Sequence, residues 1–340
     1  MPWRERSNWL TTWARSTGSR RPPTSTETTV KASRVSGGGG RSSSAASAAA
    51  GEGRIRWLPL LPALIYVVLV TQVPFLLTIY YSLFNWNLLR PGAPEFAGVA
   101  NYTAVATNPS IRIALFNTVL LTILAVGISV VLGVAIALLL NKEIFGKGVL
   151  RTLMIGPFLV MPVAGALIWK DTLLNPIFGL VDYLLSPIGL GRVDWVGQFP
   201  MATIVTIEVW RWTPFMMLIV LAGLQSQNLE VLEAAGVDGA NPLQTLRYIT
   251  LPFIRPFVEL GALLGSLFIV QTFDSIFMTT QGGPGEATTN LPFLLYLVAF
   301  QGFDIGRASA IGVVAVVLTM IVATFALRTL FTIFHVEARR

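Results

Sequence analysis

The sequence predicts an all-α integral membrane protein with six transmembrane helices and a cytoplasmic helix between the fourth and the fifth. The first observation is composition: 54% of the 340 residues are hydrophobic and only 12% are charged, whereas soluble domains carry about 25% charged residues. The second is the number of apolar segments that reach the roughly 20 residues a helix needs to cross a bilayer core. Six qualify, at about 57–83, 111–140, 152–170, 201–224, 257–280 and 308–332.

Residues 1–53 come before the first apolar segment and predict a disordered, basic cytoplasmic tail. They are rich in Ser, Thr, Gly and Arg and include the glycine run Gly37–Gly40, a composition that cannot bury a core. The apolar segment behind them exceeds the apolar region of a secretory signal and lacks a small-residue cleavage site, so we expect an uncleaved helix. Residues 54–340 then form the membrane domain.

The Lys and Arg residues predict the orientation of the six helices, because cytoplasmic loops carry an excess of them. Residues 1–56, the loops 141–151 and 225–256 and the C-terminal end from Arg328 hold 18 of these residues, against five in the opposite connections. We therefore expect both termini on the cytoplasmic side of the membrane. The same pattern explains the net charge of +7 by contact with the membrane and not with nucleic acid.

A seventh apolar run, Leu291–Phe300, is too short to be another span. Its ten residues, at about 1.5 Å of rise each, reach only about half of a hydrocarbon core of ~30 Å. We expect an interfacial helix on the outer side.

The residue inventory argues against an enzyme. The sequence has no Cys and a single histidine, His335, so it cannot supply a metal or catalytic cluster based on these residues. No carboxylates pair at a useful spacing, and no Gly-x-x-x-x-Gly-Lys-Ser/Thr phosphate loop occurs. We expect no catalytic residue, bound cofactor or metal in this chain.

The connection between the fourth and fifth segments predicts a short helix, a bend and a second helix. Leu229–Ala235 consists of good helix formers, Gly239 can end that helix in a left-handed conformation, and Asn241-Pro242 can cap and start the next. Taken alone, these features also fit an ordinary amphipathic interfacial helix. The stretch reads Glu233-Ala234-Ala235-Gly236-Val237-Asp238-Gly239-Ala240 and continues to Ile249-Thr250-Leu251-Pro252.

The spacing of this stretch closely resembles the EAA motif of ABC-importer permeases. That motif runs Glu-Ala-Ala, three residues, Gly, nine residues, Ile, one residue, Leu-Pro, and this chain fits it at every position. In the family, the loop forms a coupling helix that docks into a groove on the ATP-hydrolysing subunit. The resemblance therefore implies that the docking residues are Glu233, Ala234, Ala235 and Gly239.

The resemblance covers roughly residues 57–335 and points to the sugar-type branch, near the maltose, glycerol-phosphate and polyol permeases of the maltose-transporter F-subunit type. The implied substrate is a sugar or sugar alcohol, and the implied location is the inner membrane of a bacterium. The implied partners are a second homologous permease, two copies of an ATPase that uses ATP and Mg, and an extracytoplasmic solute-binding protein. Other blocks that carry the resemblance include Asn101-Tyr102, Asn117-Thr118, Trp212-Thr213-Pro214-Phe215 and Gln281-Gly282-Gly283-Pro284-Gly285. In the last block, we expect Gly282, Gly283 and Pro284 to contact the binding protein.

Polar side chains in the fifth span are candidates for the solute path. Gln271, Asp274 and Ser275 fall at helical spacing on one face. An ionisable group at the centre of a span costs ~2.5–3.5 kcal/mol, so Asp274 should face a partner, water or the outer end of its span. A structural hydrogen bond is an equal alternative for Asp274, and the nearby Gly261 and Gly265 suit helix packing.

The fourth span and the second add further candidates. Glu208 and Arg211 are spaced for an intrahelical ion pair beside Trp210, and carboxylates with flat rings suit sugar hydroxyls and C–H faces. A purely structural ion pair is the alternative. Asn117 in the second span is a weaker candidate.

A self-sufficient secondary transporter or channel for a small polar solute is the main alternative function. It would use Asp274 and Glu208 as coupling sites, but it leaves the EAA-like spacing unexplained.

The charge distribution generates a first prediction, on topology. Single cysteines are easily introduced into this cysteine-free chain. In intact spheroplasts, a membrane-impermeant thiol reagent should label Gly285→Cys and spare Gly239→Cys, because the loop 281–307 is expected outside and the loop 225–256 inside. The reverse labelling pattern would overturn the orientation.

Overall fold

The computed structural model describes residues 60–142, 145–188 and 192–337, with side chains up to Thr324. The chain divides into two compact units, residues 1–66 and 67–340. The predicted tail, residues 1–53, lies outside the described residues. Of the first unit only Leu60–Tyr66 is described, and it is helical from Leu61.

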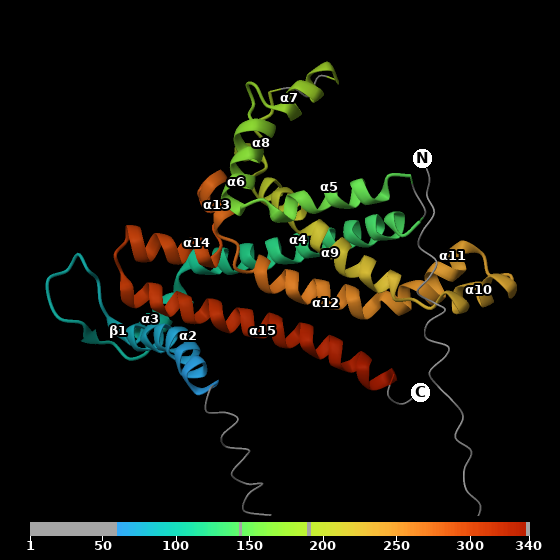
Figure 1. Cartoon of the computed structure of the whole chain (residues 1–340). Coiled ribbons are helices and arrows are strands. Elements are labelled where there is room, and N and C mark those ends of the chain that lie inside the picture. The colour runs from blue at the N-terminus through green and yellow to red at the C-terminus, as the bar shows by residue number, and fades with distance from the viewer. Residues whose placement is uncertain (1–59, 143–144, 189–191, 338–340) are drawn as a thin grey trace, which may run out of the picture. The chain divides into compact units, whose positions relative to one another are not determined.

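The described residues are mostly helical, as predicted for the fold class (Figure 1). The two strands, Phe84–Asn85 (β1) and Glu95–Phe96 (β2), form one antiparallel ladder with Phe84 opposite Phe96. The main helices are α2 (Leu61–Ser82), α3 (Ala100–Thr107), α4 (Pro109–Leu140), α5 (Lys147–Leu159), α6 (Pro162–Leu167), α7 (Leu180–Leu185), α8 (Trp195–Gln198), α9 (Pro200–Gln225), α10 (Leu229–Val237), α11 (Pro242–Thr245), α12 (Leu251–Ile269), α13 (Asp274–Thr279), α14 (Leu291–Tyr296) and α15 (Ile305–Glu337).

Four of the predicted spans are long continuous helices, namely α2, α4, α9 and α15. A fifth long apolar helix runs from Pro242 through α11 and α12 to Ile269. In all, five helices of the described part are long and apolar enough to cross a membrane, and a sixth span results if the bent pair formed by α5 and α6 counts as one.

The third predicted span, 152–170, is wrong as a straight helix. The axis turns by 98° between Lys147–Leu159 and Pro162–Leu173. The physical reason is Pro162, which disfavours the helical conformation for the residue before it. Met161 accordingly has φ −55° and ψ 133°, and α6 starts at the proline.

The fifth predicted span, 257–280, is also wrong in its outer part. The helix α12 ends at Ile269, and the break continues to Phe273 before α13 begins. Asn290 explains the break, because its side-chain Nδ2 donates to the carbonyl of Thr272 at 2.5 Å. A side chain from the loop before α14 therefore binds the Thr272 carbonyl, which would accept a backbone N–H if the helix continued.

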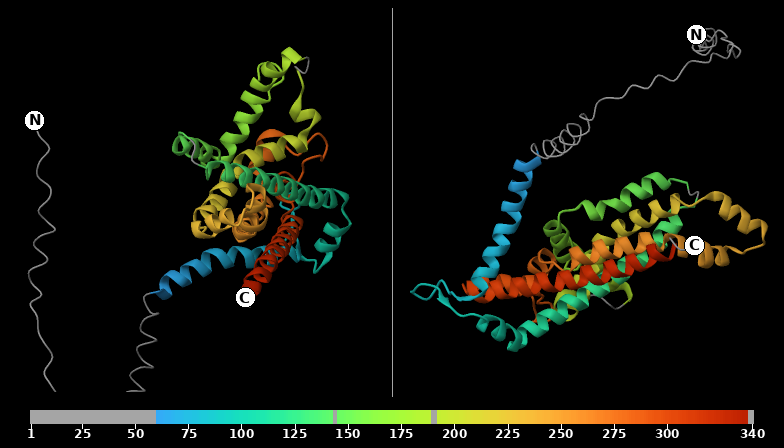
Figure 2. Two further views of the ribbon diagram at one scale, coloured as in Figure 1. Left: turned by 90° about the vertical axis from the view of Figure 1, so that its right-hand side faces the viewer. Right: turned by 90° about the horizontal axis from the view of Figure 1, so that it is seen from below.

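The core is built around α9, which packs against α4, α5 and α12 and runs beside them in all views (Figures 1 and 2). At the crossing with α4, a Cβ atom added to Gly133 would lie 2.6 Å from Met216 Cβ. On α12, Gly261 and Gly265 also face Met216, which confirms the packing role expected for this glycine pair. Small residues of this kind let membrane helices approach closely.

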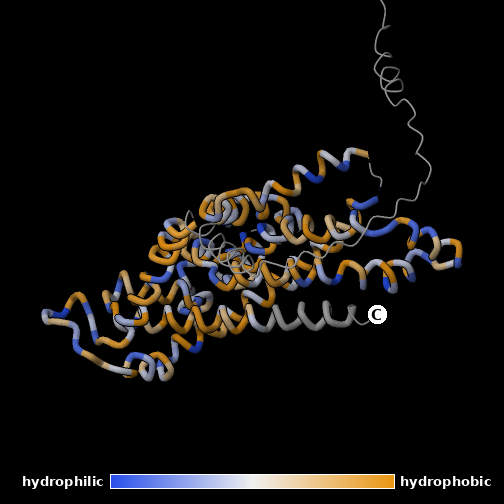
Figure 3. Tube along the Cα trace, turned by 60° about the horizontal axis from the view of Figure 1, so that its bottom comes forward, coloured by the Kyte–Doolittle hydropathy of each residue, from blue (hydrophilic) through white to orange (hydrophobic). Residues whose placement is uncertain are grey.

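The outward surfaces of the long helices are apolar. Hydrophobic residues continue around them (Figure 3), and α4 exposes Phe116, Ile123 and Val131 by more than half. A helix that is apolar on its exposed side is typical of a lipid-facing span.

The run predicted as a short outer helix is helical over α14 and its continuation to Gln301. Leu291, Phe293 and Leu294 are buried, mostly against α15 and α4. One face of this helix is therefore buried in the packed core.

Candidate functional site

A buried carboxylate links α9 to α13. Glu208 is 0% exposed; its Oε2 accepts from Arg211 Nη2 at 2.6 Å and its Oε1 accepts from the Ser275 hydroxyl at 2.5 Å. The ion pair expected from the spacing is thus present. A buried charge is strongly destabilising once its partner is removed. This network therefore holds α13, which follows the break in the fifth span, against α9.

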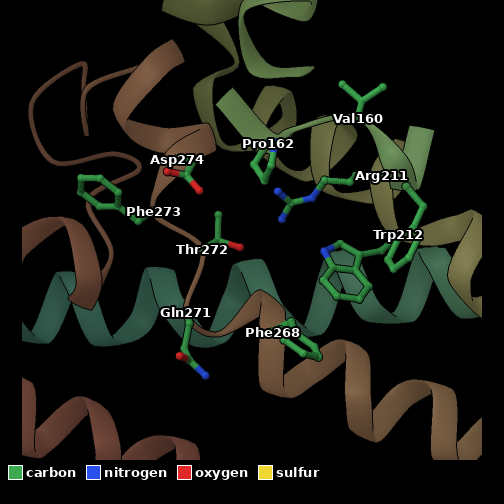
Figure 4. A pocket seen from close by; sticks show the side chains of 10 residues that line it. Val160, Pro162, Arg211, Trp212, Phe268, Gln271, Thr272, Phe273 and Asp274 are labelled. Carbon is green, nitrogen blue, oxygen red and sulfur yellow. The ribbon is translucent and has the colours of Figure 1, made fainter. Parts of the chain in front are cut away.

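A pocket of about 340 Å³, lined by apolar and charged side chains, lies directly beside this network. In Figure 4 the guanidinium of Arg211 and the carboxylate of Asp274 extend towards one another from α9 and α13. The walls come from the bend after α5, from α9, from the end of α12 and from the break before α13. They are Phe158, Val160, Pro162, Arg211, Trp212, Phe268, Gln271, Thr272, Phe273 and Asp274.

Three buried polar atoms of this pocket have no hydrogen-bond partner among the described residues. They are Arg211 Nε, Trp212 Nε1 and Thr272 Oγ1. Since a buried polar group without a partner costs about 1–3 kcal/mol, native proteins satisfy nearly all of them by protein, water or ligand. The wall of the pocket therefore contains three buried polar atoms without a partner among the described residues, beside the rings of Trp212, Phe158 and Phe268.

Four of the six predicted path residues meet at this place. Gln271 and Asp274 line the pocket, whereas Glu208 and Ser275 lie behind it in the buried network. The expectation that Gln271 shares a continuous helical face with Asp274 and Ser275 is wrong, because α12 ends before it.

The other two candidates lie elsewhere. Trp210 packs edge-on against Trp169, with ring centroids 5.9 Å apart. Asn117 donates its side-chain amide to the carbonyls of Glu286 and Thr289, at 2.9 and 3.0 Å. It therefore anchors the loop between α13 and α14.

Eight of the ten pocket residues, Trp212 and Thr272 among them, were not among the predicted path residues. Trp212 carries a signal in the sequence, since it opens the block Trp212-Thr213-Pro214-Phe215. Thr272 has no such signal, because only the break in the helix turns its hydroxyl to the pocket.

The loop 281–290 holds the residues expected to contact a binding protein. Gly282 is buried with φ 83°, and an added Cβ would lie 2.5 Å from Thr289 Oγ1, so only glycine fits there. Gly283 is partly buried, and Pro284 and Gly285 are exposed at the outside of the loop. A contact with a partner at Gly282 to Pro284 stays a prediction.

The EAA-like stretch forms the predicted helix, bend and helix. Gly239 has φ 81°, and the N–H groups of Gly239 and Ala240 donate to the carbonyls of Gly236 and Ala235, the pattern of a Schellman motif. Asn241 then starts α11 with a reciprocal capping box to Gln244.

The motif residues are presented on the surface of this turn. Glu233, Ala234 and Gly239 are exposed, while Ala235 is buried against the protein. No atom lies within 4 Å of a Cβ placed on Gly239. The turn is therefore closed by backbone hydrogen bonds and a helix cap, while the space outside Gly239 is unoccupied.

Comparison with known proteins agrees with this reading of the fold. Residues 55–339 match the family model described as binding-protein-dependent transport system inner membrane component. A probable ABC transporter permease protein of Sinorhizobium fredii is 38% identical over 265 residues, covering 77% of this chain and 85% of its own. The trehalose/maltose transport system permease protein of Thermococcus litoralis is 34% identical over 272 residues, covering 79% of this chain and 91% of its own.

The fold is also similar to that of a solved transporter. A chain in the crystal structure of a bacterial ABC transporter involved in the import of the acidic polysaccharide alginate aligns with a TM-score of 0.71, at 23% identity, over 83% of this chain and 96% of that one.

The helical bundle, its broken fifth span and the exposed turn after α10 thus define an inner-membrane transport subunit. The chain belongs to the family of inner membrane components of binding-protein-dependent transport systems.

The buried network generates a second prediction. Glu208→Ala leaves the Arg211 charge buried without its partner, so the purified protein should lose about 3–5 kcal/mol of stability in detergent. Ser275→Ala removes one hydrogen bond to a charged group and should lose about 1.5–3 kcal/mol. Thermal unfolding in detergent measures both.

The control is Thr206→Ala, an exposed position on the same helix, where a change within about 0.5 kcal/mol is expected. Equal, small losses for Glu208→Ala and Thr206→Ala would show that the ion pair contributes nothing to stability.

Proposed function

We propose that this chain is the permease subunit of an ABC importer that moves a sugar or sugar alcohol across the cytoplasmic membrane. The single observation that carries the solute class is the pocket with unpartnered donors at Arg211, Trp212 and Thr272 beside aromatic rings. Sugars present hydroxyl oxygens to such donors and C–H faces to such rings. Relatives support the class: besides the trehalose/maltose permease, the trehalose transport system permease protein of Mycobacterium tuberculosis is 34% identical over 263 residues.

The pocket is the proposed solute path through this subunit. Charged groups inside a span are costly unless they face protein or a water-filled cavity, and Arg211 and Asp274 both border this space. Glu208 neutralises Arg211 from behind, which suits an uncharged solute. Asp274 then acts as a hydrogen-bond acceptor for hydroxyl groups.

The energy would come from a separate subunit. We place an ATPase against Glu233, Ala234, Ala235 and Gly239 on the cytoplasmic side. The importer would hold two copies of this ATPase, which use ATP and Mg. Both termini of the permease would lie on the same, cytoplasmic side. The exposed side of the turn has room for another backbone, and its capped, hydrogen-bonded inner side can transmit motion to α12.

Two further partners complete the proposed importer. A second homologous permease would close the open side of the pocket, and an extracytoplasmic solute-binding protein would deliver the solute near Gly282, Gly283 and Pro284. A related structure supports the latter: the similar alginate transporter has been solved in complex with an alginate pentasaccharide-bound periplasmic protein.

A third prediction tests the ATPase contact. Gly239→Trp places a large side chain on the exposed turn and should lower both recovery of the ATPase and solute uptake, by about tenfold if docking loses ~1.4 kcal/mol. Uptake in proteoliposomes and co-purification in detergent measure this.

Gly146→Trp is the matched control. Gly146 is also exposed, has φ 77° and has no atom near an added Cβ, so the backbone strain is equal while the EAA-like turn is intact. Equal effects of the two substitutions, or normal coupled hydrolysis in Gly239→Trp, would count against docking at this turn.

A fourth prediction tests the solute path. Asp274→Asn keeps a hydrogen-bond acceptor and should weaken uptake only moderately, whereas Asp274→Leu removes it and should weaken uptake strongly, because an unmatched buried donor of the solute costs about 1–3 kcal/mol. Assembly with the partner subunits is checked in the same samples. If both variants assemble and transport with unchanged apparent affinity and rate, the solute does not pass Asp274.

A further inference from the structure

An arm that begins within the third predicted span, at the bend before Pro162, leaves the helical bundle. It consists of α6 with its continuation to Leu173, then α7 and α8, and it returns to the bundle at Pro200. After the 98° turn the arm runs across the direction of α4, α9 and α12 (Figures 1 and 2). If those helices cross the membrane, the arm extends along the membrane plane.

The helix before the arm, α5, is too short to cross a membrane alone. It has 13 residues before the turn, which corresponds to about 20 Å at ~1.5 Å per residue, whereas a hydrocarbon core is ~30 Å thick.

The inner side of the arm carries an apolar pocket of about 380 Å³ beside α9. Its lining includes Trp169, Leu174, Val181, Leu185 and Trp195. These apolar side chains of α7, α8 and the root of the arm therefore face one another.

The far side of α7 and the turn before it is uncovered. Ile177 is 84% exposed, Phe178 70% and Tyr183 75%, and Leu180 and Leu184 are also exposed. We call these five residues the arm patch. Its area is apolar and aromatic, the composition of a protein interface core.

Charged residues argue against lipid as the cover of the arm. Asp171, on the continuation of α6, is exposed. Asp182, on α7 between the members of the arm patch, is half-buried and accepts from the backbone N–H of Arg192. Lys170 donates to the carbonyl of Met278 at 3.2 Å, which ties the root to α13. An exposed carboxylate such as that of Asp171 is costly in contact with acyl chains, whereas a protein surface can supply donors to it.

The pocket bordered by Arg211 and Asp274 indicates which protein lies beside the arm. Val160 and Pro162 belong both to the wall of the pocket and to the root of the arm. Arg211 and Asp274 cannot face lipid without cost, and the second permease proposed above would close the open side of this pocket. Whatever covers the pocket also lies next to the arm.

We propose that the arm patch packs against the second permease of the importer. The two permeases would then meet at the pocket and continue in contact along the arm. This inference rests on the proposed function, because it takes its partner from there.

The experiment introduces the photo-crosslinking residue p-benzoylphenylalanine into the complete transporter. The positions are Phe178 and Tyr183 in the arm patch, with Val131 of α4, 67% exposed, as the matched control on a lipid-facing helix. After irradiation in membranes, each variant is purified in detergent and its partners are identified by mass spectrometry.

We expect Phe178 and Tyr183 to give a gel band shifted by the mass of the second permease, and Val131 to give no such band beyond background. Adducts at the arm patch with lipid alone, or with the binding protein, would overturn the proposal. So would protein adducts no stronger than those of Val131. If the complex retains no second permease before irradiation, the proposed function itself fails, and the two failures are thus distinguishable.

Discussion

The cost of burying charge in a membrane protein shapes this structure. Glu208 is fully buried, and it is matched by Arg211 on its own helix and by the Ser275 hydroxyl from α13. The Glu208 carboxylate accepts hydrogen bonds from two elements. It therefore holds α13 against α9, although the fifth span is interrupted between α12 and α13. The pocket, with Arg211 on one wall and Asp274 on another, exists because this connection holds both walls in place.

Interruptions of helices, more than the helices themselves, create the functional surfaces. The Met161-Pro162 bend ends α5 and starts the arm, and the break at 270–273 places Gln271 and Thr272 in the wall of the pocket. One carbonyl freed by this break, that of Thr272, accepts from the Asn290 side chain. Irregular backbone at membrane depth is tolerated where protein buries it or where it lines a cavity.

The sequence predicts the continuous elements well and the tertiary breaks poorly. The helices α4 and α9 match their predicted ranges, since apolar length and flanking proline residues are local signals. The turn at Gly239 was equally predictable, because glycine and the Asn241-Pro242 cap act locally. The break after Ile269 was not, since its cause is Asn290, distant in sequence.

The candidate site follows the same rule. The pairing of Glu208 with Arg211 was visible from a spacing of three residues, whereas the bond to Ser275 and the pocket at Thr272 required the packed structure. Asn117 shows the opposite error. As a polar residue in a span it was predicted to line the solute path, but its amide binds the loop between α13 and α14.

The crossing of α4, α9 and α12 has a mechanical consequence. Met216 contacts Gly133 of α4 and both Gly261 and Gly265 of α12. A methionine side chain has several rotatable bonds and adapts its shape to its surroundings, while the glycines opposite it offer smooth backbone without side chains that interlock. The three helices therefore meet at a joint whose crossing angles can shift through rotamer changes of one side chain, so the bundle is able to deform at its centre without opening a cavity.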